Sequence, residues 1–370
     1  MGLNFTSSDI FVYIHIPFCT KRCFYCDFTS TTNLSLVEDY FKALSSDIRS
    51  AENFFKDRTI RTIYFGGGTP SLIDPSYIRG ILKILRGFNY DPVEITIELN
   101  PESTTRGNLV GYKDMGINRI SLGVQAFDNE VLNLSGRPHG IREIIRALDH
   151  ISYVFENFNL DFIVGLPGYD EKVIDANLEL VEKFDPSHVS VYTLEIHEDT
   201  PIYKMYTSGK LDLPENTMEL FFKMVDGLKK LGYERYEISN FAKNNSYSVH
   251  NLSYWYSMNY LGFGVSAGGY FESWRYVKTP NIRKYIKNPS ALFYEKKNSL
   301  CEDSREILFM GLRLLKGVPE SKISVKDMIE RISDHIIIKD GNIIARNVDD
   351  PDIFEIVSNF NCLELEAHRV

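Results

Sequence analysis

Six short apolar runs, rich in β-branched residues, recur through the first half of the chain and limit what it can fold into. They lie at residues 11–16, 62–65, 94–99, 119–124, 161–164 and 189–194. Each gap is long enough for a helix and its loops, which is the strand–helix–strand rhythm of a parallel sheet. Six such units are fewer than the eight of a closed barrel. We therefore predict an α/β fold that begins with an incomplete (βα)6 barrel.

Three of the gaps carry apolar residues at helical spacing, at 36–51, 141–153 and 171–184. This periodicity predicts amphipathic helices that pack one face against the sheet. In parallel α/β folds, ligands bind beyond the carboxyl ends of the strands. The residues that follow each apolar run are therefore the first candidates for a functional site.

The rhythm breaks after about residue 200. A helix is predicted over 213–231 and a further strand over 233–239, and residues 246–276 are rich in Tyr, Trp, Ser and Gly. Such a composition is typical of an irregular segment rather than of another strand–helix unit. We expect an α+β extension here.

The end of the chain has its own pattern. A helical stretch covers 305–315, and the segment HIIIKDGNIIAR predicts a hairpin that turns at Asp340 and Gly341. A helix beside a small hairpin resembles a winged-helix arrangement. We therefore expect three parts: the barrel at 1–200, the extension at 201–295 and a small winged-helix-like domain at 296–370.

The charge balance narrows the class of ligand. The chain has 41 Lys and Arg against 50 Asp and Glu, a formal net charge of −9. It lacks the chain-wide positive field that non-specific nucleic-acid binding needs, so we expect no nucleic-acid partner.

The sequence has no apolar run of about 18 residues and no cleavable leader before its first cysteine. We therefore expect no stable membrane insertion and a cytoplasmic location.

Cys19, Cys23 and Cys26 form a CxxxCxxC pattern directly after the first apolar run. Five cysteines with three in one short loop do not resemble a disulfide framework. Three thiolates can hold a [4Fe–4S] cluster and leave one iron open to an outside ligand. Two alternatives to a cluster remain. One is a zinc site that is only partial, because structural zinc normally takes four protein ligands, and the other is three ordinary buried cysteines. Cys301 and Cys362 are isolated, and we interpret them as small buried residues.

Polar or glycine residues mark the ends of several other runs. They are Gly67, Gly68 and Thr69 after the second run, Glu98 in the third, Gln125 after the fourth with Arg137 beyond it, and Asp161 in the fifth. Glycines let backbone groups approach a ligand closely, and a carboxylate can accept hydrogen bonds from hydroxyl groups. One such feature is usually structural, but several in register with successive strands predict a common site.

Five motifs together resemble one family. The segments YIHIPFCxxxCxYC, YFGGGTPSL, ELNP, SLGVQAF and DFIVGLPG are similar to those of the radical S-adenosylmethionine (SAM) family around the oxygen-independent coproporphyrinogen III oxidases. The resemblance covers residues 10–320. It implies a [4Fe–4S] cluster on Cys19, Cys23 and Cys26, whose fourth iron is chelated by the amino and carboxylate groups of SAM. The SAM-binding positions that it implies are Tyr13, Phe24, Tyr25, Gly67, Gly68, Thr69, Glu98, Gln125, Arg137 and Asp161.

Two departures separate this chain from the oxidases themselves. Phe28 stands where they have a fourth cysteine, and only about ten residues precede the first run, too few for their N-terminal extension. The segment HNxxYW, from His250 to Trp255, instead resembles the marker of the HemW-type heme chaperones. The resemblance implies that His250 contributes to a heme site, as an axial ligand or through a covalent bond. A histidine in an aromatic patch is otherwise a hydrogen-bonded core or surface residue.

Three functions stay open at this point. The first is a carrier that binds heme and passes it to an unidentified acceptor protein, with the extension covering the ligand and the glycine-rich residues 261–269 closing over it. The second is radical decarboxylation of coproporphyrinogen III, and the third is a methyltransferase on the same scaffold. Phe28 disfavours the second, and HNxxYW favours the first over the third. We expect an electron donor as a further partner, allow for a homodimer and assign no catalytic residue.

Overall fold

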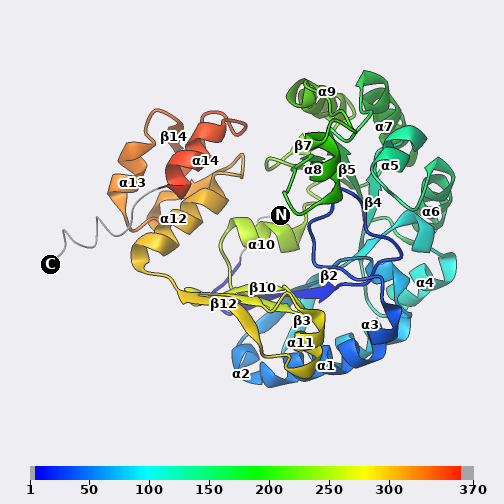
Figure 1. Cartoon of the computed structure of the whole chain (residues 1–370). Helices are drawn as coiled ribbons and strands as arrows, with labels where there is room; N and C mark the ends of the chain where they lie inside the picture. The colour runs from blue at the N-terminus through cyan, green and yellow to red at the C-terminus, as the bar shows by residue number, and fades with distance from the viewer. Residues whose placement is uncertain (1–4, 360–370) are drawn as a thin grey trace.

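A computed structural model of the chain describes residues 5–359 (Figure 1). Its centre is a sheet of twelve strands in the order β12-β11-β10-β9-β1-β2-β3-β4-β5-β6-β8-β7. The strands from β1 to β6 lie in chain order, and each is parallel to its neighbour. They confirm all six predicted strands. These strands are β1 (Asp9–Ile16), β2 (Thr59–Gly67), β3 (Tyr90–Leu99), β4 (Arg119–Gln125), β5 (Phe158–Val164) and β6 (His188–Thr193).

Helices connect the parallel strands and lie in an arc along their outside (Figure 1). The helices predicted at 36–51, 141–153 and 171–184 are confirmed as α1, α6 and α7. The helix predicted from residue 213 begins only at Thr217, because the Thr217 hydroxyl donates to the Pro214 carbonyl oxygen at 3.1 Å in a preceding turn. The helices are α1 (Val37–Ser50), α2 (Glu52–Phe55), α3 (Pro75–Leu85), α4 (Arg106–Asp114), α5 (Asn129–Leu134), α6 (Ile141–Val154), α7 (Glu171–Phe184), α8 (Pro201–Thr207) and α9 (Thr217–Lys230), with 3-10 turns η1 (Leu34–Leu36), η2 (Pro70–Leu72) and η3 (Pro101–Ser103).

The sheet is mixed, and strand pairing within residues 5–359 leaves β12 and β7 as open edges. Pairing therefore does not close these strands into a ring. Next to β6 lie the antiparallel strands β8 (Asn240–Ala242) and β7 (Glu234–Arg235). The single strand predicted over 233–239 is wrong, because the chain reverses there. The Tyr236 N–H donates to the Asn240 carbonyl oxygen at 3.1 Å and closes that turn.

The other edge of the sheet is built by residues that follow α10. Strand β9 pairs parallel with β1, and β10, β11 and β12 continue outward as antiparallel neighbours. The expected extension therefore adds strands to both edges of the main sheet. Its elements are α10 (Val249–Trp255), β9 (Tyr260–Phe263), β10 (Gly268–Phe271), β11 (Trp274–Lys278), α11 (Ile282–Lys287) and β12 (Leu292–Lys297).

The last described residues form a separate antiparallel sheet in the order β13-β15-β14. The predicted hairpin is confirmed, because β14 and β15 pair antiparallel and Asp340 and Gly341 form the turn with φ angles of 51° and 76°. Gly tolerates such angles freely, and Asp tolerates them better than most residues. The elements are α12 (Leu300–Gly311), β13 (Val318–Pro319), η4 (Glu320–Lys322), α13 (Lys326–Arg331), β14 (Ile336–Lys339), β15 (Asn342–Ala345) and α14 (Pro351–Ser358).

Helix α12 lies a few residues earlier than the stretch predicted at 305–315. Ser299 and Glu302 form a capping box that starts the helix at Leu300. Cys301 is buried in the hydrophobic core of this C-terminal part, as expected. Cys362, for which we expect the same, lies outside the described residues.

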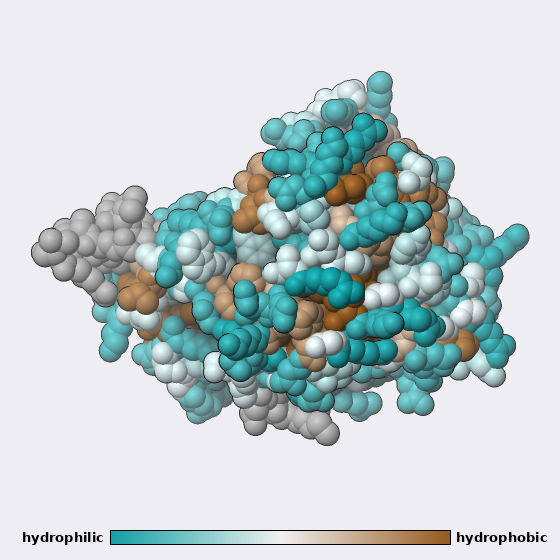
Figure 2. Space-filling view, turned by 90° about the horizontal axis from the view of Figure 1, so that it is seen from below, coloured by the Kyte–Doolittle hydropathy of each residue, from teal (hydrophilic) through white to brown (hydrophobic). Residues whose placement is uncertain are grey.

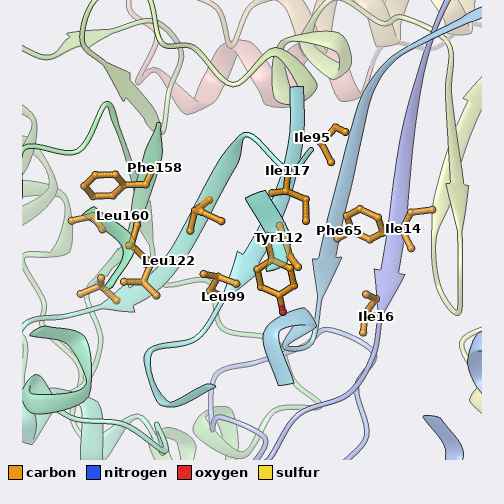
Figure 3. Packing of buried hydrophobic residues seen from close by; sticks show 14 of the residues in the cluster. Ile14, Ile16, Phe65, Ile95, Leu99, Tyr112, Ile117, Leu122, Phe158 and Leu160 are labelled. Atoms are coloured by element: carbon orange, nitrogen blue, oxygen red, sulfur yellow. The ribbon is translucent and has the colours of Figure 1, made fainter. Parts of the chain in front are cut away.

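The main core lies between the parallel strands and the helices that cover them (Figure 3). Along β4, Ile120, Leu122 and Val124 are buried in this core, and the intervening Ser121 points to the opposite face of the sheet. The other strands alternate in the same way. The core residues labelled in Figure 3 are Ile14, Ile16, Phe65, Ile95, Leu99, Tyr112, Ile117, Leu122, Phe158 and Leu160.

The opposite face of the parallel strands is polar although it is also buried. Thr62, Thr96, Arg119, Asn159 and His188 are each no more than 2% exposed. Buried polar groups need hydrogen-bond partners, so this face and the strand ends beside it are where a site can form.

The outer surface seen from below is mostly hydrophilic, with apolar residues in separate small areas (Figure 2). No helix within residues 5–359 is long and apolar enough to cross a bilayer.

Candidate functional site

The loop that carries the three clustered cysteines begins where β1 ends. Cys19, Cys23 and Cys26 are free thiols, of which Cys23 is buried and the other two are partly exposed. The Cys19 N–H donates to the Thr31 carbonyl oxygen at 3.0 Å, and the Thr31 N–H donates to the Pro17 carbonyl oxygen at 2.7 Å. These two bonds tie the start of the loop to its end.

Two donors from later strand ends reach the sulfur atoms. The Thr69 hydroxyl lies 3.7 Å from Cys19 Sγ, and Arg137 Nη1 lies 3.4 Å from Cys23 Sγ. Burial raises the pKa of the Cys19 thiol and raises that of Cys26 to about 11. A metal bound by these sulfurs therefore has to displace their protons.

The residues of this loop could hold either a single metal ion or a multi-iron cluster, and the two need different arrangements of ligands. Within residues 5–359, no three His, Cys, Asp or Glu side chains lie close enough together to hold a single ion. A multi-iron cluster places each thiolate on a different iron. Three thiols on one loop, with a guanidinium and a hydroxyl beside two of them, are a donor set that fits such a cluster.

Arg137 joins several of the predicted residues. Its Nη1 lies 3.3 Å from the Tyr25 hydroxyl, and its Nη2 donates to Asn100 Oδ1 at 2.9 Å and to the Gly123 carbonyl oxygen at 3.2 Å. Its Nε is buried and has no hydrogen-bond partner within residues 5–359. Burial opposes the charge, but Tyr25 and Cys23 raise the pKa of Arg137, so the guanidinium stays positive beside the loop.

Sequence reasoning missed the role of Asn100, although it lies in the quoted ELNP motif. Its Nδ2 donates to Thr69 Oγ1 at 3.0 Å, and its Oδ1 accepts from Arg137. Glu102, in the next turn, lies 3.1 Å from His139 Nδ1 through its Oε2. Burial lowers the pKa of His139, so its imidazole is neutral at pH 7. Asn100 therefore links the ends of β2 and β4 beneath the cysteine loop.

Gly67, Gly68 and Thr69 hold the end of β2 against the cysteine loop. The Thr69 N–H donates to the Phe18 carbonyl oxygen at 2.8 Å. A Cβ on Gly68 would lie 2.8 Å from that oxygen, and one on Gly67, where φ is 113°, would lie 2.5 Å from the His15 ring. Such distances are shorter than real contacts, so glycine is required for this close approach.

Two buried carboxylates follow in the neighbouring strands. Glu98 accepts from the Tyr64 hydroxyl and from the Gly67 N–H, both at 2.9 Å. Burial, and then the nearby Asp161, raise the pKa of Glu98 to about 7. Asp161 accepts from the Ser121 hydroxyl at 2.7 Å, and burial raises its pKa as well. These carboxylates can accept hydrogen bonds from the hydroxyl groups of a ligand.

The remaining positions that the resemblance assigns to SAM lie on the same strands or in the same loop. The Tyr13 hydroxyl lies 3.0 Å from His15 Nδ1, and the Phe24 N–H donates to the Ser135 carbonyl oxygen at 3.0 Å. Gln125 ends β4 with a φ of 67°. The ligand roles of all these residues stay predictions.

His250 lies on α10, which packs against β2 and β3. Its side chain is 1% exposed, and its ring stacks on Tyr64 with 5.1 Å between centroids. Nδ1 lies 2.6 Å from the Thr62 hydroxyl, and Nε2 lies 2.6 Å from the Tyr254 hydroxyl. Burial, with the charge of Arg119, lowers the pKa of His250 to about 3. Both ring nitrogens of the predicted heme ligand are thus engaged, and heme binding through it stays a prediction.

Glu94 holds the helix that carries His250 in this place. Its carboxylate accepts the Val249 N–H at 2.8 Å and the His250 N–H at 3.1 Å, at the start of α10. A carboxylate is favourable at a helix N-terminus because it satisfies free N–H groups there. Sequence reasoning missed this residue, since nothing local connects it to α10.

The last two predicted features lie near the cysteine loop. Phe28 is 59% exposed, so the position of the missing fourth cysteine faces solvent. The glycine-rich residues 261–269 reach the loop through one hydrogen bond, 2.7 Å long, between the hydroxyls of Ser266 and Thr29. This segment therefore borders the loop, and its closing over a ligand stays a prediction.

Comparison with known proteins places these features in a family. The Radical SAM superfamily model matches residues 13–181. A protein of Buchnera aphidicola from Schizaphis graminum, named heme chaperone HemW, is 38% identical over 87% of this chain and 88% of its own length. The heme chaperone HemW of Bacillus subtilis is 32% identical over 85% of this chain and 86% of its own length.

Among solved structures, the chain resembles the coproporphyrinogen III oxidase HemN of Escherichia coli. The TM-score is 0.79, and the match covers 94% of this chain and 88% of that one. At 20% sequence identity, this likeness concerns the fold alone. The polar strand ends, the cysteine loop and the fold thus agree with the radical SAM superfamily.

Proposed function

This chain belongs to the HemW family of heme chaperones on a radical SAM scaffold, and from that premise we propose that it binds heme and transfers it to an acceptor protein. The observation that carries the proposal is the 38% identity with a HemW protein along nearly the whole length of both chains. The intact segment HNxxYW, from His250 to Trp255, supports it.

We infer that a [4Fe–4S] cluster is held by Cys19, Cys23 and Cys26, with SAM beside it. When bound, the cluster can supply an electron to the sulfonium of SAM. The residues around the cysteine loop supply a positive charge and hydrogen-bonding groups. Arg137 places a positive charge next to Cys23, where a cluster collects negative charge, and Thr69 donates toward Cys19. Glu98 and Asp161 offer carboxylate oxygens for ribose hydroxyls.

Radical decarboxylation of coproporphyrinogen III is the second candidate, favoured by the HemN-like fold. Phe28 stands in place of the fourth cysteine of the oxidases, and its exposed ring supplies no thiol there. We therefore rank the carrier first. No observation favours the methyltransferase.

We extend the proposal to architecture, location and partners. The six parallel strands and their helices are consistent with an incomplete (βα)6 barrel, and the C-terminal sheet with a winged-helix-like domain. We keep a cytoplasmic location as part of the proposal. We keep an electron donor as an expected partner and still allow for a homodimer.

Hemin titration separates the candidates. The wild-type chain should bind hemin at a defined stoichiometry, and His250→Ala should bind it more weakly if this histidine contributes to the site. Equal binding by both proteins would remove His250 from the site while leaving the carrier function in place. Incubation with coproporphyrinogen III, SAM and a reductant without oxygen is the second arm, and turnover to protoporphyrinogen would favour the oxidase.

A further inference from the structure

A cavity of about 440 Å³ lies between the outer strands of the main sheet and α12. Its volume falls in the range of small-molecule sites, about 300–1,000 Å³. The lining combines the aromatic rings of Tyr260, Tyr294 and Phe309 with the cations Arg275, Lys296 and Arg305. This combination suits a ligand that is flat, largely apolar and negatively charged at one edge.

One wall of the cavity is flat. Gly268 of β10 lines it without a side chain, and a Cβ there would meet only the Tyr276 carbonyl oxygen, at 3.8 Å, so the backbone is open on this face. On the opposite face of β10 the Tyr276 ring covers Gly269, and its hydroxyl accepts the Gly262 N–H at 3.0 Å, which holds this part of the sheet in place. A rigid, flat surface of this kind can lie along a planar macrocycle without losing side-chain entropy.

The cations of the cavity are held by carboxylates from one helix. Arg275 Nη1 donates to the Tyr260 hydroxyl at 2.6 Å, and its guanidinium is paired with Glu306. Lys296 is paired with Glu302. Both glutamates belong to α12. A ligand carboxylate that replaces one of them keeps the cation paired, and the displaced glutamate has to turn to solvent or take up a proton.

The cavity adjoins the HNxxYW helix. The Tyr260 ring packs against Tyr254 with 4.5 Å between centroids, and the Tyr254 hydroxyl is the group that holds His250 Nε2 at 2.6 Å. Helix α10 also packs on α12. A ligand in the cavity is thus separated from the motif by a single layer of tyrosine rings.

We propose that this cavity binds the propionate-bearing edge of a porphyrin, with Arg275 and Lys296 as the partners of the propionates. The proposal rests on the proposed heme function and names the groups that recognise the charged edge of the ligand. Three cations, Arg275, Lys296 and Arg305, line the cavity beside two glutamates, and the two carboxylates of a planar ring can pair with the first two of these cations.

The test compares hemin with its dimethyl ester, which lacks the two negative charges. The wild-type chain should bind the ester about tenfold or more weakly than hemin, since a charge-assisted hydrogen bond is lost at each propionate. The Arg275→Gln/Lys296→Gln double variant should bind both ligands equally. Lys297→Gln is the matched control, because Lys297 is the next residue of β12 and does not line the cavity. It should keep the wild-type preference.

Lys296→Gln alone keeps the test valid if the double variant folds poorly, because the Lys296 side chain is 46% exposed. It should reduce the preference for hemin over the ester. The same preference in the wild-type chain and in Lys296→Gln would overturn the proposal. Failure of the wild-type chain to bind either ligand would overturn the heme function with it, whereas hemin binding without any preference over the ester would overturn the cavity proposal alone.

Discussion

The two ends of the parallel strands are built in opposite ways. At the carboxyl end, the cysteine loop carries three free thiols, and the buried Nε of Arg137 has no partner among the described residues. Toward the amino end, both ring nitrogens of His250 are hydrogen-bonded, and the Glu94 carboxylate accepts hydrogen bonds from two backbone N–H groups. Buried donors without a partner among the described residues also occur toward the amino end, at Arg119 Nε and Trp255 Nε1. The two ends therefore differ in the groups that a ligand could use, which are free thiols at one end and an enclosed, hydrogen-bonded histidine at the other.

This difference bears on how His250 can act. The HNxxYW helix is a fixed part of the fold, with its first N–H groups on Glu94 and its histidine enclosed. An iron bound at His250 Nε2 has to replace the hydrogen bond to Tyr254. The carboxyl end requires no such exchange beyond the loss of thiol protons.

The largest effect is expected at the carboxyl end, for Cys23→Ser. Removing one of three thiolates should abolish almost all of the visible iron–sulfur absorbance and iron content after anaerobic reconstitution. Thr20→Ala, at an exposed position of the same loop, is the control and should load like the wild type. Full loading of Cys23→Ser would refute the assignment of the three cysteines.

The next largest effect is expected for Glu98→Gln, as a change in how the free energy of unfolding depends on pH. Burial raises the pKa of Glu98 from 4.5 to about 7, so the folded state favours the protonated carboxyl. Its contribution to stability is complete below about pH 4.5 and is lost as the pH rises through about 7. Relative to Glu98→Gln, the free energy of unfolding of the wild-type apoprotein should fall by about 3 kcal/mol across this window.

Urea denaturation at several pH values from 4.5 to 8 measures this difference. Glu130→Gln, at an exposed position in α5, is the control and should show no such dependence. A difference between the wild type and Glu98→Gln that does not change with pH would speak against a buried, protonated Glu98.

Gly68→Ala tests the contact between β2 and the cysteine loop. A Cβ would lie 2.8 Å from the Phe18 carbonyl oxygen, so the loop has to shift. We expect a loss of about 2 kcal/mol in the free energy of unfolding, together with reduced iron loading. Gly80→Ala is the matched control, because that glycine lies in α3 with nothing within 4 Å of an added Cβ. Unchanged stability in Gly68→Ala would show that the loop tolerates the methyl group.

The smallest effect is expected for Tyr254→Phe, at the amino end. Losing the hydrogen bond to His250 Nε2 should cost about 1 kcal/mol of unfolding free energy. If His250 binds iron, the variant should bind hemin at least as tightly as the wild type, because no hydroxyl has to be displaced. Tyr153→Phe, at a site 71% exposed, is the control. Weaker hemin binding by Tyr254→Phe would count against iron binding at Nε2.

Much of the carboxyl end could be predicted, because parallel strands in chain order bring their ends to one edge of a sheet. Tyr25 and Arg137 were both assigned to it, and their side chains meet at 3.3 Å although 112 residues separate them. The strand expected over 233–239 failed for a local reason. The turn that breaks it, from Tyr236 to Asn240, contains no glycine or proline to mark it.

By itself, the sequence determined the six parallel strands and the loop of three thiols, because apolar periodicity and residue spacing are local properties of a chain. Only the tertiary structure decided that Arg137 reaches Cys23 from 114 residues away and that Thr62 holds His250 across 188 residues. Those contacts depend on how distant segments pack. The same packing leaves three free thiols at one end of the strands and encloses His250 toward the other.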